Sequence, residues 1–147
     1  MGSRRKAREC ILQMLYQYDL VGSSANDVIR NYWSSNNADD DIRIFSNEML
    51  SGIVKDIESI DKRIADNSTN WKITRMAAVD KNILRLAVYE LFFRDDIPVK
   101  VTINEAVEVA KKYGTKDSGS FVNGVLDNIA KGIKKEVSGG EEVLESA

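Results

Sequence analysis

Apolar residues recur every three or four positions along most of the chain, and this spacing predicts α-helices. The longest regular run extends from residue 42 to residue 64 and predicts one long helix. A helix is also expected over residues 4–21, and a shorter one over residues 26–33. The long run is formed by apolar residues at positions 42, 45, 49, 53, 57, 60 and 64.

In the second half of the chain, residues typical of helix ends mark three more helices. Thr74 is expected to cap a helix that ends before Pro98, because proline cannot lie inside a helix. Residues 102–105, Thr-Ile-Asn-Glu, form a capping box and are expected to open the next helix. Either Asp117 or Ser118 is then expected to cap the last helix.

The order of these segments predicts an all-α fold of about seven helices in two packed helical bundle halves. Alternation of apolar and polar residues at period two is scarce, so strands are not expected. A polar break separates halves at about 4–66 and 71–135, and residues 1–135 are expected to pack as one domain. The acidic tail, 136–147, is expected to be flexible.

Composition narrows the class of protein. The 147 residues are 43% hydrophobic and 30% charged, which is typical of one soluble globular domain. The chain shows no signal peptide and no apolar run long enough to span a bilayer, so we expect a cytoplasmic protein that does not enter membranes.

The residue types of the chain also limit its chemistry. It contains no histidine and no glycine-rich phosphate loop, so we expect no enzyme activity and no cofactor. The single cysteine, Cys10, forms no disulfide within the chain, and it is either a packed thiol or one activated by nearby bases. Residues 39–41, three aspartates, suggest either a divalent metal site or a solvated helix cap, and we favour the cap, with no metal.

Positive charge is concentrated at the N-terminus. Residues 1–8 contain Arg4, Arg5, Lys6 and Arg8 and no acidic residue, which leaves 17 Lys and Arg against 23 Asp and Glu, a net charge of -6, in the remainder. Such a basic segment either solubilises the protein or approaches a phosphate backbone while the acidic remainder repels nonspecific nucleic acid.

Several blocks of sequence resemble the NusB antitermination family, and their order and spacing match that family across residues 4–133. The N-terminal blocks are 4–9, RRKARE, and 15–17, LYQ. The later blocks are 80–91, DKNILRLAVYEL; 96–98, DIP; 101–106, VTINEA; 110–114, AKKYG; and 121–127, FVNGVLD.

The resemblance implies a function as well as a fold. NusB-like proteins pair with NusE, a small-subunit ribosomal protein, and bind single-stranded boxA RNA. The complex joins RNA polymerase and suppresses termination, notably in ribosomal RNA operons. We therefore expect an RNA-binding transcription antitermination factor with these partners.

Candidate RNA-binding residues follow from the same resemblance. The basic residues Arg4, Arg5, Lys6 and Arg8 supply phosphate contacts, and Arg4 and Arg8 are expected on one side of a helix, one turn apart. Tyr16, Asp117 and Phe121 match family positions near RNA, although Tyr16 and Phe121 also fit a hydrophobic core. Asp80 is expected either to contact a partner or to complement the helix dipole.

Three other readings are consistent with parts of the pattern. The first alternative is a homodimeric interaction scaffold with weak RNA binding. A related helical domain precedes RNA cytosine methyltransferases, but this chain is too short to include a methyl-donor domain. A helix-turn-helix DNA-binding protein lacks support because no basic recognition helix lies outside the N-terminus.

Overall fold

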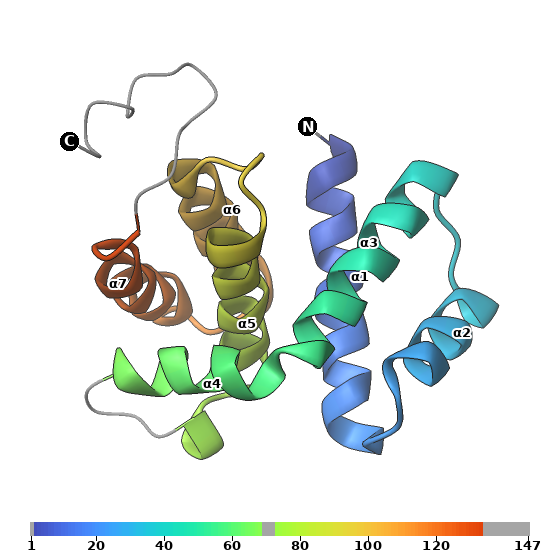
Figure 1. Ribbon diagram of the computed structural model, residues 1–147, viewed down its shortest axis with the longest axis horizontal. Coiled ribbons are helices and arrows are strands. Elements are labelled where there is room, and N and C mark those ends of the chain that lie inside the picture. Colours follow the sequence, from blue (N-terminus) through green and yellow to red (C-terminus); the bar gives the residue numbers. More distant parts are fainter. Residues whose placement is uncertain (1, 69–72, 134–147) are drawn as a thin grey trace. The chain divides into compact units, whose positions relative to one another are not determined.

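The computed structural model describes residues 2–68 and 73–133. The expected acidic tail lies outside these ranges. Every regular element within them is a helix, and the all-α expectation with about seven helices is confirmed (Figure 1). The elements are α1 (Gly2–Val21), α2 (Ala25–Ser35), α3 (Asp40–Lys55), α4 (Ile57–Asp66), the 3-10 helix η1 (Ile73–Arg75), α5 (Ala78–Phe93), α6 (Val99–Tyr113) and α7 (Ser118–Ala130).

The described helices form two compact units, the first ending at residue 57 and the second beginning at residue 58. In the first unit, α1 packs along α3, and α2 packs on both (Figure 1). The side chains of Ile11, Leu15 and Ile53 in this unit are completely buried. Their spacing on α1 and α3 is the helical apolar stripe that the sequence showed.

The second unit consists of the remaining helices, with α5, α6 and α7 packed on one another (Figure 1). Its α4 is joined to α5 by an ion pair in which Arg85 Nε lies 2.8 Å from Asp61 Oδ1. The guanidinium of Arg63, also on α4, stacks over the ring of Phe92 at 3.9 Å from its centroid. These contacts place the division between units at 57/58, whereas the sequence suggested one near residues 66–71.

The expected single helix over residues 42–64 is wrong, because the chain leaves helical geometry at Asp56. Its φ of -108° and ψ of 22° end α3, and its backbone N–H donates to the carbonyl of Gly52. The apolar spacing continues unchanged through Ile53, Ile57 and Ile60, since both helices bury that face. Periodicity alone therefore does not reveal the break.

Two helices begin at other residues than the capping patterns indicated. A turn of 3-10 helix occupies Ile73–Arg75, so α5 starts after Ala77 and Thr74 does not cap it. Helix α6 starts directly after Pro98, three residues before the expected capping box. The hydroxyl of Thr102 instead donates to Glu90 Oε1 at 2.8 Å, a buried hydrogen bond between α6 and α5. A buried acceptor is satisfied by this arrangement.

None of the described helices is both long and apolar enough to cross a membrane.

Candidate nucleic-acid interface

The basic N-terminal residues lie in the first two turns of α1. Arg4, Arg5 and Lys6 are exposed, and the first turn of this helix contains no acidic residue. Arg8 differs from them, because it is only 4% exposed. We call the exposed residues Arg4, Arg5 and Lys6 the basic turn.

The position of Arg8 follows from the geometry of the helix. Residues 4, 8, 11 and 15 share one face at 3.6 residues per turn, and Ile11 and Leu15 on this face are completely buried. Arg8 therefore lies one turn inside the buried stripe, while Arg4 lies at its outer end. Arg4 and Arg8 do lie one turn apart on one side of the helix, as expected, but only Arg4 is exposed there.

Arg4 makes a defined contact within the first unit. Its guanidinium carbon lies 4.2 Å from the centroid of the Phe45 ring on α3, a cation–π geometry. Phe45 is half-buried, whereas Arg4 is exposed. The contact therefore holds an exposed cation against a fixed aromatic surface.

Arg5 and Tyr16 share a second, solvent-facing side of α1. They are eleven residues apart, which is three turns and about 16 Å along the helix axis. Tyr16 is 48% exposed, so the alternative that it belongs to the core is wrong. An exposed guanidinium and an exposed aromatic ring on one helix face fit the phosphate and base-stacking contacts of single-stranded RNA.

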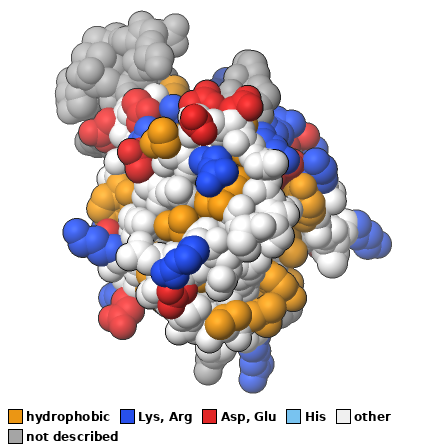
Figure 2. All heavy atoms as spheres, turned by 90° about the vertical axis from the view of Figure 1, so that its right-hand side faces the viewer, with side chains coloured by type: hydrophobic (Ala, Val, Ile, Leu, Met, Phe, Trp, Pro, Cys, Tyr) orange, Lys and Arg blue, Asp and Glu red, His pale blue; other side chains and the backbone are white. Residues whose placement is uncertain are grey.

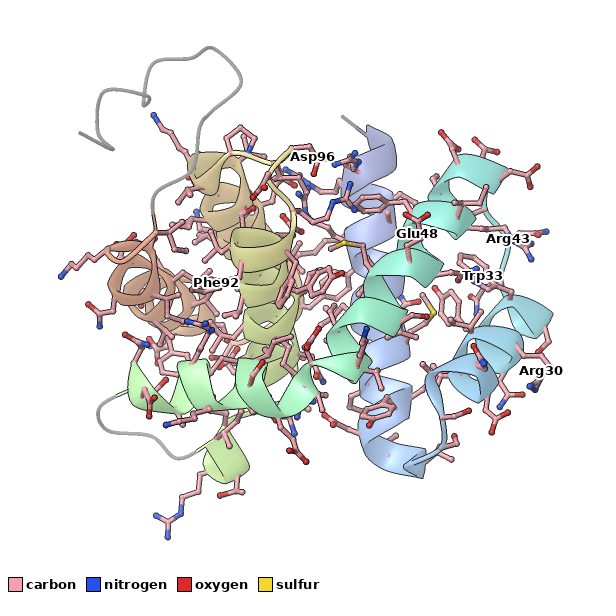
Figure 3. The ribbon with its side chains drawn as sticks, in the orientation of Figure 1. Arg30, Trp33, Arg43, Glu48, Phe92 and Asp96 are labelled. Carbon is pink, nitrogen blue, oxygen red and sulfur yellow. The ribbon has the colours of Figure 1, made fainter. Side chains whose placement is uncertain are left out.

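A second arginine in this unit also lies over an aromatic ring. Arg43 lies 4.9 Å from the centroid of the Trp33 ring, where α2 faces α3 (Figure 3). The indole N–H of Trp33 donates to Asn47 Oδ1 at 2.8 Å. Asp39 and Asp40 precede Arg43 by four and three positions, on the same side of α3, and their charges disfavour a phosphate there.

Charged side chains of both signs are exposed on the surface. Figure 2 shows several Lys and Arg side chains at the upper right of one face, with acidic side chains beside them and along the top. A cluster of this kind provides a local basic surface on a protein whose net charge is -2.

In the second unit, Asp117 and Phe121 lie one turn apart at the start of α7. Asp117 occupies the N-cap position and is exposed, but its carboxylate makes no capping hydrogen bond. Ser118 does not cap the helix either, because its hydroxyl accepts from the backbone N–H of Thr115 at 3.0 Å. Phe121 is half-buried, so part of its ring packs in the second unit and part is accessible to a ligand.

Near Asp117 lie exposed residues that were not predicted from the sequence as candidates for RNA binding. Tyr113 ends α6 and is 38% exposed, and the ammonium of Lys112 lies 5.2 Å from its ring centroid. Lys116 is exposed in the same loop. We call Lys112, Tyr113 and Lys116 the α6–α7 corner. The available signal in the sequence was the presence of two lysines within three residues of Tyr113, at the end of a helix.

Gly114 makes the tight geometry of this corner possible. A Cβ atom on it would lie only 2.3 Å from the Ser118 hydroxyl oxygen, and 2.9 Å from the carbonyl oxygen of Ala110. The hydrogen bond between Ser118 and Thr115 therefore requires glycine at position 114.

Asp80 lies in the first turn of α5, where a carboxylate complements the helix dipole. The residue is half-buried, and its Oδ1 is inaccessible to solvent and has no hydrogen-bond partner among the described residues. Only the rest of the side chain is available to a binding partner, and such a contact stays a prediction.

The hypotheses of a metal site and of an activated cysteine have little support within residues 2–68 and 73–133. No group of three His, Cys, Asp or Glu side chains within these ranges is arranged to hold a metal ion. Cys10 is 3% exposed, which identifies it as a packed thiol.

Comparisons with known proteins agree with the resemblance seen in the sequence. The model of the NusB family matches residues 5–131. A transcription antitermination protein NusB from Sorangium cellulosum is 44% identical over 133 residues, covering 90% of this chain and 95% of the relative. The protein of the same description from Geotalea daltonii is 48% identical over 141 residues, covering 90% of this chain and 97% of the relative.

Solved structures share the fold as well. T. maritima NusB superimposes with a TM-score of 0.81 at 38% identity, covering 88% of this chain and 92% of that one. A NusB protein crystallised with NusE and double-stranded RNA gives a TM-score of 0.80 at 31% identity, covering 89% of this chain and 98% of that one.

Proposed function

The chain belongs to the NusB family of transcription antitermination proteins, and from this we propose that it binds RNA together with the ribosomal protein NusE. In this proposal the RNA is single-stranded boxA, and the complex acts on RNA polymerase, notably in ribosomal RNA operons. The protein acts in the cytoplasm as an adaptor without catalysis of its own.

One observation carries the proposal: the basic turn is exposed at the start of α1, and Tyr16 is exposed three turns along on the face of Arg5. Cations supply the phosphate contacts, and an exposed ring supplies a stacking surface for an unpaired base. Arg8 is assigned a structural role within this proposal because it is buried.

The second unit contributes its own candidate contacts. Asp117 and Phe121 match family positions near RNA, and the α6–α7 corner adds two exposed lysines and a partly exposed ring. We propose that this corner contacts the RNA backbone, and that Asp80 contributes to the NusE-binding surface.

The experiment is a fluorescence anisotropy titration of labelled boxA RNA with this protein, alone and with NusE. A scrambled single strand and a duplex of the same sequence serve as controls, because the related complex contains double-stranded RNA. We expect boxA to bind most tightly and NusE to tighten that binding.

Thermodynamic linkage provides an internal check. RNA must tighten NusE binding by the same factor by which NusE tightens RNA binding. Equal affinity for boxA and scrambled RNA would refute boxA recognition. A stable homodimer in sedimentation that RNA does not dissociate, together with weak RNA binding, would favour the interaction scaffold.

A further inference from the structure

Two arginine–aromatic pairs in the first unit differ in their surroundings. Acidic side chains occur on α3 near both rings, but only the Arg4–Phe45 pair includes an arginine of the basic turn, whereas the Arg43–Trp33 pair joins α3 to α2. Phe45 was not singled out as a functional residue from the sequence, where it reads only as one member of an apolar stripe. Its contact with Arg4 gives this ring a second role.

The contact arises from the packing of α1 on α3. Phe45 lies in the stripe of α3 that includes the buried residues Ile42 and Met49, and it is half-buried. Arg4 occupies the outer end of the stripe of α1 that packs inward. The ring and the guanidinium therefore meet at the edge of the packed interface, where one side chain is fixed and the other is exposed.

We propose that Phe45 is a positioning residue for RNA binding, because its ring fixes the Arg4 guanidinium at the surface before RNA arrives. This inference rests on the proposed function. A free arginine side chain loses considerable rotamer freedom when it is ordered on a phosphate, and that loss weakens binding. Stacking over Phe45 orders the side chain in the unbound protein, so less freedom is lost on association.

The ring contributes without touching the RNA. A cation over an aromatic face keeps its positive charge, and a guanidinium donates hydrogen bonds from its edges, in the plane of the group. Stacking therefore leaves the chemistry that recognises a phosphodiester oxygen unchanged. Phe45 sets where the charge lies, and Arg4 makes the contact.

The test replaces Phe45 by leucine, which keeps an apolar side chain and removes the aromatic face. We expect the F45L protein to bind boxA RNA about three- to tenfold more weakly at low salt, as loss of one ordered side chain implies. The F45W variant keeps an aromatic face and should retain most of the affinity. Circular dichroism melts of each variant measure folding separately.

The chain offers a matched control in the second unit. Phe92 is half-buried and carries Arg63 over its ring at 3.9 Å, so F92L removes the same chemical group from beneath an arginine. We expect F92L to leave RNA affinity unchanged. If F92L weakens binding as much as F45L does, the effect is a general one on the fold and the proposal is overturned.

A double-mutant cycle separates positioning from packing. If Phe45 acts through Arg4, F45L should have no further effect on RNA affinity in an R4A protein. An equal loss in both backgrounds would overturn the proposal. RNA binding that depends on Arg4 but not on Phe45 would overturn it and leave the proposed function intact, whereas no RNA binding by the unaltered protein would overturn both.

Discussion

Arg85 on α5 binds the carboxylate of Asp61 on α4 through two hydrogen bonds of 2.8 Å, from Nε to Oδ1 and from Nη2 to Oδ2. The remaining guanidinium nitrogen, Nη1, donates to Asn82 at 3.0 Å. A ten-residue helix is too short to be stable in isolation, so α4 depends on contacts of this kind. The pair explains why α4 packs with the second unit.

Asp61→Ala is expected to destabilise the protein by about 2–3 kcal/mol, because the 8%-exposed Arg85 side chain would keep its charge without its carboxylate. Urea unfolding followed by circular dichroism measures the change. As a control, Asp66→Ala breaks the exposed ion pair with Lys62 and should cost less than about 1 kcal/mol. Equal losses for the two variants would contradict the role of the buried pair.

Arg8→Ala is expected to lower the free energy of unfolding by about 1–3 kcal/mol, since a buried polar side chain and its packing are lost. The exposed Arg5→Ala should change stability by less than about 0.5 kcal/mol. The two variants are compared by thermal melting and by RNA titration. An Arg8→Ala protein that melts normally but loses RNA affinity would show that Arg8 reaches the RNA.

Asp117→Asn is expected to tighten RNA binding about two- to fivefold at low salt, because removal of an exposed negative charge relieves repulsion of phosphates. Since the carboxylate makes no capping hydrogen bond, Asp117→Ala should change stability by less than about 0.5 kcal/mol. Affinity is measured at two salt concentrations, beside the melting temperature. Weaker RNA binding by a stably folded Asn variant would show that the carboxylate accepts a hydrogen bond from a base or from a partner.

Replacement of Arg4, Arg5 and Lys6 together by alanine is expected to reduce the log–log salt dependence of RNA binding by about 2, since each phosphate contact to a single strand contributes about 0.7. These side chains are exposed, so helix content should be retained. Titrations at several salt concentrations give the slope. An unchanged slope would assign the phosphate contacts to other residues, with the lysines of the α6–α7 corner as the next to test.

The sequence predicts the all-α class and most helix positions because each helix buries a face with a 3.6-residue period. It fails where periodicity carries no information. The apolar spacing runs unbroken across Asp56, and only the backbone geometry shows that two helices meet there. The capping box at residues 102–105 matches a real pattern, but Pro98 begins the helix earlier and Thr102 bonds to Glu90 instead.

In the candidate site, too, some features are predictable from local sequence, and others depend on tertiary packing. The exposed basic turn follows directly from residue types at the start of a helix. The burial of Arg8 follows instead from its position, three residues before the buried Ile11 and on the same face, and its charge alone did not indicate it. The contact between Arg4 and Phe45 joins residues 41 positions apart, and no local pattern predicts such a pair.

Because Cys10 is buried, the reactivity of its thiol reports local opening of the protein. It is the single cysteine in the chain, and its side chain, in the third turn of α1, is only 3% exposed. A thiol-modifying dye therefore reacts only in molecules in which this part of α1 has opened, so the labelling rate measures the free energy of that opening. A ligand that binds the closed form slows labelling in proportion to its occupancy. RNA binding can thus be followed through the reactivity of Cys10, with no label attached to the RNA.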